Sequence, residues 1–142
     1  MTLGRNRRSF AAELGSIHAS RSWCRQLIDE PPWCRERAPD IELCVTELVT
    51  NAISYGTGDR LGVEVVSPDE SSLELTVQST GPFIGEFSWP PELAAQTDIT
   101  GRGLFLAHAV SDELTRDLEP GSVTFTARFI DPSTEPGLDG AP

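Results

Sequence analysis

The clearest hydrophobic pattern in the chain lies in residues 41–55, which read IELCVTELVTNAISY. Apolar residues recur there three and four positions apart, at Ile41, Val45, Leu48 and Ala52. This spacing places them on one face of an α-helix, with Cys44 and Val49 widening the apolar stripe. The segment therefore predicts a helix that packs against the core.

Two polar residues lie on the flank of that stripe. Glu47 and Asn51 are four positions apart, so a carboxylate and a carboxamide point the same way on a helix. Beside a polar ligand, such a pair can supply a proton acceptor and a neutral oxygen ligand for Mg²⁺. The solvated edge of an ordinary amphipathic helix accounts for the same two residues.

The periodicity of the rest of the chain predicts an α+β protein. In chain order the predicted elements are a strand Ser9–Leu14, a helix Ile17–Ile28, a loop Asp29–Pro39, the helix ending near Tyr55, strands Leu61–Val66 and Ser72–Gln78, a loop Ser79–Thr100, a helix Leu104–Leu114 and a strand Val123–Ile130. Hairpin-connected strands separated from helices favour a two-layer sandwich, in which helices cover one face of a mixed sheet.

Length and composition fit one domain. We expect residues 1–8 to be a flexible N-terminus, residues 9–130 to form a single domain and residues 131–142 to be a disordered tail.

The chain has no run of about 18 apolar residues and no apolar signal core, so we expect neither a membrane span nor secretion. Three cysteines without a CxxC pair favour core thiols in a reducing cytoplasm over a zinc site or a disulfide framework. The formal net charge of -11 argues against direct contact with nucleic acid or anionic membranes.

A glycine-rich segment, Gly101-Arg102-Gly103, precedes the second apolar helix. Glycines ahead of a helix let a phosphate approach the backbone, and the unpaired N–H groups of the helix N-terminus attract it. Arg102 adds a positive charge that suits a terminal phosphate. A tight turn into a helix explains the glycines on steric grounds alone.

The order of these segments resembles that of a known family. ELVTNAISYG, TGRGLFLAHAVSDEL and GSVTFTARF resemble the first box, the glycine-rich box and the closing strand of bacterial anti-sigma factor serine/threonine kinases. That family lies in the superfamily of histidine kinase, gyrase and Hsp90-type ATPases, which share the Bergerat fold. The resemblance runs from about Arg8 to Ile130.

The resemblance implies an ATP and Mg²⁺ site. By position, Asn51 would ligate the Mg²⁺ that bridges the nucleotide phosphates, and Glu47 would activate the hydroxyl of a substrate serine or threonine. A lid of roughly Phe83–Thr100 would close over the phosphates. The residues that would wrap the phosphates are Gly101, Arg102, Gly103 and Leu104.

One position departs from the family pattern. The middle box of the family normally carries an aspartate two residues before a glycine, and this aspartate accepts the adenine amino group. Aligned on Gly81, that position is Ser79, whose hydroxyl is shorter and uncharged. Losing a charged acceptor worth about 1.5–3 kcal/mol would weaken adenine recognition tenfold or more.

The resemblance leaves two functions open. One is a cytoplasmic anti-sigma-type kinase that phosphorylates an antagonist protein and sequesters a sigma factor, with homodimerisation as a family expectation. The other is a non-catalytic protein-binding module of the same fold, which the departure at Ser79 favours. A sensor histidine kinase is disfavoured, because the sequence shows no dimerisation helix with a phosphoacceptor histidine.

Overall fold

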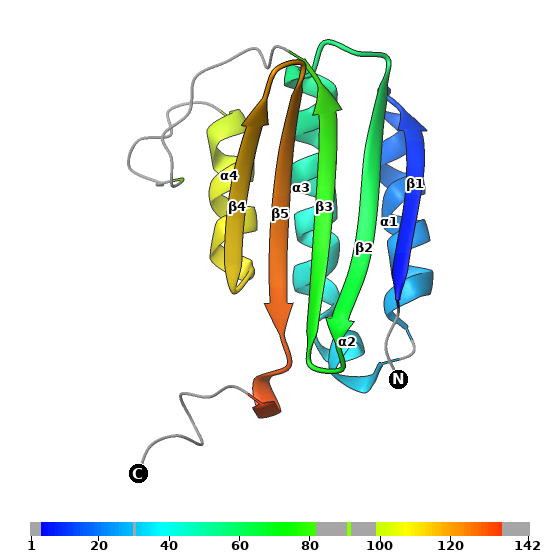
Figure 1. Cartoon of the computed structure of the whole chain (residues 1–142), viewed down its shortest axis with the longest axis vertical. Coiled ribbons are helices and arrows are strands. Elements are labelled where there is room, and N and C mark those ends of the chain that lie inside the picture. Colours follow the sequence, from blue (N-terminus) through cyan, green and yellow to red (C-terminus); the bar gives the residue numbers. More distant parts are fainter. Residues whose placement is uncertain (1–3, 30, 82–90, 92–98, 135–142) are drawn as a thin grey trace.

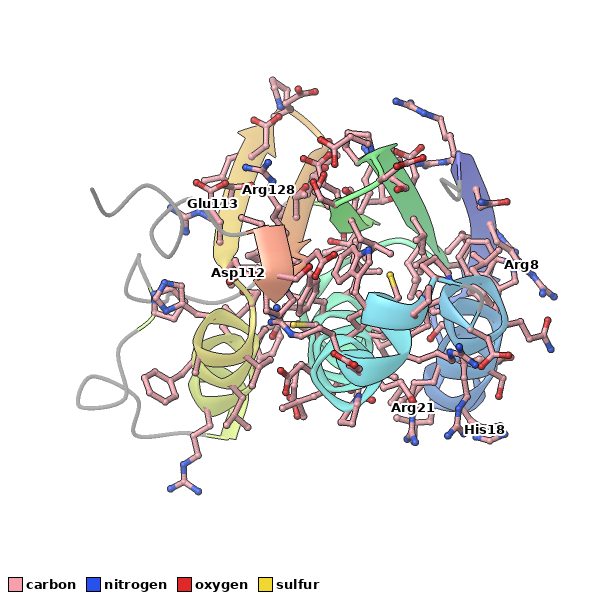
Figure 2. All side chains as sticks on the ribbon, turned by 90° about the horizontal axis from the view of Figure 1, so that it is seen from below. Arg8, His18, Arg21, Asp112, Glu113 and Arg128 are labelled. Atoms are coloured by element: carbon pink, nitrogen blue, oxygen red, sulfur yellow. The ribbon has the colours of Figure 1, made fainter. Side chains whose placement is uncertain are left out.

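A computed structural model describes residues 4–29, 31–81, 91 and 99–134. Five strands form one layer and the helices form the other, behind a single face of the sheet (Figures 1 and 2). The strands are β1 Arg5–Ala11, β2 Arg60–Asp69, β3 Ser72–Thr80, β4 Glu113–Glu119 and β5 Ser122–Ile130. The helices are α1 Gly15–Ile28, α2 Pro32–Glu36, α3 Ala38–Tyr55 and α4 Ile99–Val110. The predicted two-layer α+β sandwich is confirmed.

The sheet has the strand order β1-β2-β3-β5-β4. Each of the four described pairings is antiparallel, so the sheet is antiparallel and not mixed as the sequence had suggested. The connections explain this arrangement. Short turns join β2 to β3 and β4 to β5, and such turns can only reverse the chain direction.

The core lies between the inner face of the sheet and the helices. Along β3 and β5 alternate residues are buried, as the period of two predicts, and Val77 lies opposite Phe125 in the register. The apolar stripe of α3 covers these strands, and Val45 and Leu48 have no exposed surface. Burying one such side chain is worth about 1.5–3 kcal/mol, so the predicted stripe of α3 is a main contributor to the core.

The last helix and the strand after it differ from the prediction. The helix was expected over residues 104–114, but α4 ends at Val110 and β4 then begins at Glu113. The Ser111 hydroxyl bonds back to the helix, while the backbone N–H of Asp112 donates to Arg128 of β5. The sequence does not predict β4, because Leu114 is its one buried residue and the strand has no alternation of apolar and polar positions.

The N-terminal and C-terminal boundaries also shift. β1 begins at Arg5, within the residues expected to be flexible, and pairs with β2 over its whole length. A short helix, α2, occupies part of the loop expected between residues 29 and 39. At the other end, Pro132–Thr134 forms a 3-10 turn, and the rest of the predicted tail lies outside the described residues.

A largely buried arginine ties the helices to the sheet. The side chain of Arg37, between α2 and α3, is 16% exposed. Its partners are the carboxylates of Asp40 and Asp112 at 3.4 and 3.1 Å, the carbonyl oxygens of Val110 and Ile130 at 3.0 and 3.3 Å, and the ring of Phe129. The guanidinium is thus satisfied on several sides by groups of this chain.

Candidate functional site

The candidate site lies where α3 and α4 run side by side in opposite directions (Figure 1). Gly103 of α4 faces Glu47 of α3 so closely that a Cβ built on Gly103 would lie 2.5 Å from Glu47 Oε2. A Cβ at this position would displace the mobile end of the Glu47 side chain, so glycine is what lets the carboxylate lie against α4. Two predicted site residues, 56 positions apart in the sequence, are therefore neighbours.

Asn51 is one turn beyond Glu47 on the same helix. Its side chain is only 3% exposed, and its amide nitrogen Nδ2 has no hydrogen-bond partner among the described residues. A buried polar group without a partner costs about 1–3 kcal/mol, so native proteins rarely keep one without a reason. Rotation of the amide exchanges its oxygen and nitrogen, so this side chain can offer a ligand either a donor or an acceptor.

The Glu47 carboxylate is half-buried between the two helices. Burial raises its pKa above the ordinary value of a glutamate, because the charged form loses hydration. A raised pKa brings the carboxylate closer to the range in which a general base works at neutral pH. A cation bound nearby would oppose the shift and keep the group ionised.

Ser79 lies at the end of β3 and is 4% exposed. The loop after α3 packs against it, since a Cβ on Gly56 would lie 3.0 Å from the Cβ of Ser79. One residue on, the backbone N–H of Thr57 donates to the carbonyl of Thr80 at 2.9 Å. Gly56 fixes how closely the C-terminal end of α3 approaches β3, a role that the sequence did not reveal because the residue reads as a helix stop.

Gly81 follows β3 directly and is buried. Its backbone N–H donates to the carbonyl of Gly121 in the β4–β5 turn at 2.9 Å. Gly121 has a φ of +83°, which favours glycine and suits the turn after Pro120. The predicted Gly81 is thus held by the backbone of the neighbouring hairpin.

The glycine-rich segment lies differently from the prediction. We expected Gly101-Arg102-Gly103 to precede the helix, but α4 begins at Ile99 and includes all three residues. The sequence missed this because glycine is a poor helix former, whereas here the contact with Glu47 requires it. Arg102 is exposed, and the Leu104 side chain is 1% exposed in the core, so only the backbone of Leu104 could face a ligand.

The structure thus brings together Glu47, Asn51 and Gly103 from two helices. Ser79 and Gly81 lie at the end of β3, joined to α3 through the Gly56 loop. Most of the predicted lid, residues 83–100, lies outside the described residues, and its last two belong to α4.

A family model for the histidine kinase-like ATPase domain matches residues 10–129. The chain belongs to this family. The match begins near the end of β1 and ends one residue before the end of β5, so it includes all four helices, β2, β3, β4 and every residue of the candidate site. No curated protein matches the chain.

Solved structures share the fold. The RsbU and RsbW domains of Rv1364c from Mycobacterium tuberculosis align at 16% identity with a TM-score of 0.65, over 89% of this chain and 32% of that one. The catalytic domain of histidine kinase ThkA aligns at 14% identity with a TM-score of 0.54, covering 89% and 97% of the two chains. Histidine kinase AdeS from Acinetobacter baumannii aligns at 15% identity with a TM-score of 0.50, over 89% and 68%. The chain spans about a third of the Rv1364c chain, and at these identities the likeness concerns the fold.

The residues present fit a magnesium–nucleotide complex better than a metal bound by protein alone. In the part of the chain that the structure describes, no group of three or more His, Cys, Asp or Glu residues could hold a metal ion. The unpaired amide of Asn51 instead offers one ligand of the kind that Mg²⁺ takes from a protein when phosphates and water supply the others, and the Glu47 carboxylate stays available as a proton acceptor.

The cysteines take no part in the site. All three are free and buried, and burial raises the pKa of Cys24 and Cys44 to about 12 and that of Cys34 to about 11. Thiols that stay protonated are poor nucleophiles, which agrees with their prediction as core residues. None of the described helices is both long and apolar enough to cross a membrane.

Proposed function

We propose that this ATPase-family domain binds ATP with Mg²⁺ and acts as an anti-sigma-type protein serine/threonine kinase. The observation that carries the proposal is the unpaired, buried amide of Asn51 one helical turn from the half-buried carboxylate of Glu47. A packed domain has no structural use for this pair, whereas a phosphoryl-transfer site needs both a metal ligand and a base.

The roles follow from the chemistry of each group. Asn51 would hold the magnesium ion, and Glu47 would accept the proton of the substrate hydroxyl. Mg²⁺ supplies charge neutralisation between the phosphates when it is bound. Gly103 positions the base, because the absence of a side chain lets the Glu47 carboxylate lie against α4. The N–H groups at the start of α4 would offer hydrogen bonds and a positive dipole end to phosphate oxygens.

The partners in this proposal are proteins. The substrate would be a small antagonist protein that carries the phosphorylated serine or threonine, and the sequestered partner would be a sigma factor. The presence of RsbU and RsbW domains in Rv1364c supports a regulator of this kind. The sequence resemblance of the two boxes around Glu47 and Gly103 supports it further.

One observation favours a second candidate, a protein-binding module without catalysis. Ser79 occupies the position at which the family carries an aspartate for adenine. Its side chain is buried at the end of β3, so no longer acceptor projects from that position. A domain that kept its partners but lost nucleotide affinity would tolerate this change.

Calorimetry of ATP binding, with and without Mg²⁺, separates the two candidates. For the kinase we expect Mg²⁺-dependent binding that Asn51→Ala weakens at least about tenfold, because a charged hydrogen bond or metal ligand is lost. Thr50→Ala is the matched control, since the Thr50 hydroxyl bonds back to Thr46 within α3. If the chain fails to bind ATP at millimolar concentration but still binds its partner proteins, the result would favour the non-catalytic protein-binding module.

Phosphate transfer is the second step of the test. Incubation with labelled ATP and a co-encoded antagonist should label the antagonist, and Glu47→Gln should abolish labelling while leaving ATP affinity close to that of the parent. Labelling that survives Glu47→Gln would remove Glu47 as the base.

A further inference from the structure

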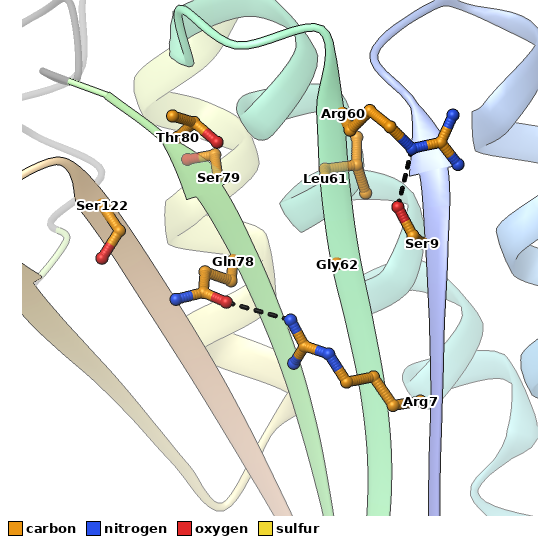
Figure 3. Close-up of a pocket in the computed structure, with 9 residues that line it drawn as sticks. All are labelled: Arg7, Ser9, Arg60, Leu61, Gly62, Gln78, Ser79, Thr80 and Ser122. Carbon is orange, nitrogen blue, oxygen red and sulfur yellow. Dashed lines mark hydrogen bonds between the residues drawn. The ribbon is translucent and has the colours of Figure 1, made fainter.

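A pocket lies on the open face of the sheet, away from the helices (Figure 3). Its volume is about 300 Å³. The nine lining residues come from four strands and are Arg7, Ser9, Arg60, Leu61, Gly62, Gln78, Ser79, Thr80 and Ser122. The proposed kinase chemistry uses Ser79 alone among them, and the pocket therefore has no assigned role.

The pocket is rich in hydrogen-bond donors. Arg7 extends from β1 across β2 and donates from Nη2 to Gln78 Oε1 at 3.1 Å, which leaves the amide nitrogen of Gln78 free to donate (Figure 3). Arg60 donates from Nε to the Ser9 hydroxyl at 2.8 Å. Each guanidinium has five N–H groups, so one bond each leaves most of their donors available.

The charge around the pocket is opposite to that of the chain. The whole sequence has 22 acidic and 11 basic residues, yet the described lining contains two arginines and no acid. Within the described residues neither Arg7 nor Arg60 pairs with a carboxylate. Glu64 lies opposite Arg7 in the register but pairs with Arg5 at 3.8 Å. Two arginines without a described carboxylate partner make the potential over this part of the sheet more positive than that of the acidic chain as a whole.

The floor of the pocket is built for the arginine. A Cβ on Gly62 would lie 2.7 Å from Arg7 Nη2, so the absence of a side chain at residue 62 lets the guanidinium take its present place over β2. A glycine weakens a strand, since it has no side chain to pack. Here it provides the space that lets Arg7 reach Gln78.

We propose that this pocket binds a phosphate monoester. A tetrahedral dianion accepts hydrogen bonds from several directions, and here the Arg7 guanidinium and the Gln78 amide lie beside each other over β2 and β3, while the Arg60 guanidinium lies over β1 at the edge of the pocket (Figure 3). Arginine is the preferred partner of phosphate, because its planar donors make paired, charge-assisted bonds. The ligand is either a free phosphate ester or phosphate, or a phosphorylated side chain of a protein. The proposal does not depend on the kinase function, because the pocket opens on the face of the sheet that the helices leave uncovered.

The experiment is an NMR titration of the ¹⁵N-labelled chain with inorganic phosphate, with a short peptide carrying one phosphoserine, and with acetate. We expect saturable shifts of the amides of Gly62, Gln78 and Ser122 with both phosphate probes. Because Gly62 and Ser122 lie on strands whereas Asn51 and Gly103 lie on the helices behind the other face of the sheet (Figure 1), different amides report on this pocket and on phosphate bound between the helices. Tighter binding of the peptide than of phosphate identifies a protein-borne ligand, and equal binding identifies a free one.

Three variants define the site. Arg7→Gln should weaken phosphate binding about tenfold, because a charge-assisted bond is lost. Gly62→Ala should weaken it as well without any change of charge, since the new Cβ displaces the Arg7 guanidinium, the mobile end of a long side chain. Arg8→Gln is the matched control: it removes the same charge from the same strand outside the lining, the described contact of Arg8 is the Phe10 ring, and binding should stay within about twofold.

Four outcomes would overturn the proposal. They are the absence of shifts at these amides with millimolar phosphate, shifts confined to the nucleotide site, an equal loss in Arg8→Gln and Arg7→Gln, and acetate binding as tightly as phosphate. The third would mean that only the general charge of β1 attracts the anion.

Discussion

Two clusters of buried polar groups in this domain differ in how completely the chain satisfies them. Arg37 is surrounded by two carboxylates, two carbonyl oxygens and an aromatic ring, all from this chain. In the site between α3 and α4, by contrast, the Asn51 amide has no described partner and the Glu47 carboxylate has a pKa raised by burial. One cluster is complete within the fold, and the other is not.

The difference separates a structural role from a functional one. A charge satisfied inside the chain contributes to folding or to a unique arrangement, and needs nothing from outside. An orphaned donor and a destabilised carboxylate cost stability, and such costs concentrate at binding and catalytic sites. The comparison predicts that variants in the first cluster change stability, whereas variants in the second change activity.

The largest effect is expected for Arg37→Ala. Removing the guanidinium leaves the carbonyl oxygens of Val110 and Ile130 without this donor, and a buried group left unpaired typically costs about 1–3 kcal/mol. The carboxylates of Asp40 and Asp112 are partly exposed and contribute less, so we expect a total loss of about 3 kcal/mol. Urea unfolding measures it, with Arg35→Ala as the control because Arg35 is exposed on α2. An Arg37→Ala protein as stable as the parent would contradict the structural role assigned to the Arg37 cluster.

Gly103→Ala should mainly change the rate of phosphoryl transfer. The new Cβ would displace the end of the Glu47 side chain, and misplacing a catalytic group by about 1 Å can cost a hundredfold in rate. Stability should not fall, because alanine is favoured over glycine in a helix by about 1 kcal/mol and the displaced carboxylate can turn toward water. Single-turnover kinetics and urea unfolding of the same preparation test both parts. A large loss of stability would mean that the helices, not the carboxylate, had moved.

The sequence predicted the layers of this fold well, because α3 and the alternating strands β3 and β5 carry strong periodic patterns. The strand β4 was not predicted, because a single buried leucine gives no visible alternation of apolar and polar residues. The proximity of Glu47 and Gly103 could not be derived from spacing, because it depends on how two helices pack. The resemblance named both residues, but only the packing explains why residue 103 has no side chain.

The surroundings of Ser79 were likewise not predictable from the sequence. The resemblance marked it as a departure, but the sequence could not show that Gly56 packs against it and leaves little room. The pocket of Arg7 and Gly62 was also invisible, because its residues lie on four strands and match no motif. Long-range packing, in which single residues meet across strands, is what the pattern along the chain does not record.

Under the proposed function, Ser79→Asp should raise the affinity of the site for ATP and lower the stability of the nucleotide-free protein. A carboxylate at this position would accept the adenine amino group, and we expect ATP affinity to rise about tenfold. Without nucleotide, the same carboxylate would be buried without a partner, so the free energy of unfolding should fall. Calorimetry and urea unfolding, each with and without ATP, measure the two effects. Thr80→Asp is the control, because Thr80 is exposed at the end of β3. Equal ATP affinity in Ser79→Asp and the parent would place adenine elsewhere.

The smallest effect is the pH dependence of stability that Glu47 causes. Burial raises its pKa in the folded state, so the folded chain binds the proton more tightly than the unfolded one. The contribution of Glu47 to stability is therefore greatest below the ordinary carboxyl pKa, falls as the pH rises through the raised pKa, and is constant above it.

Glu47→Gln has no such titration, so its free energy of unfolding should exceed that of the parent at neutral pH by less than about 1 kcal/mol, because the carboxylate is partly hydrated. Other carboxylates titrate in both proteins, and the difference between their urea-unfolding curves across acidic to neutral pH isolates Glu47. A difference that stays constant over this range would mean that Glu47 is as well satisfied as Arg37, and the incomplete cluster would then be reduced to Asn51 alone.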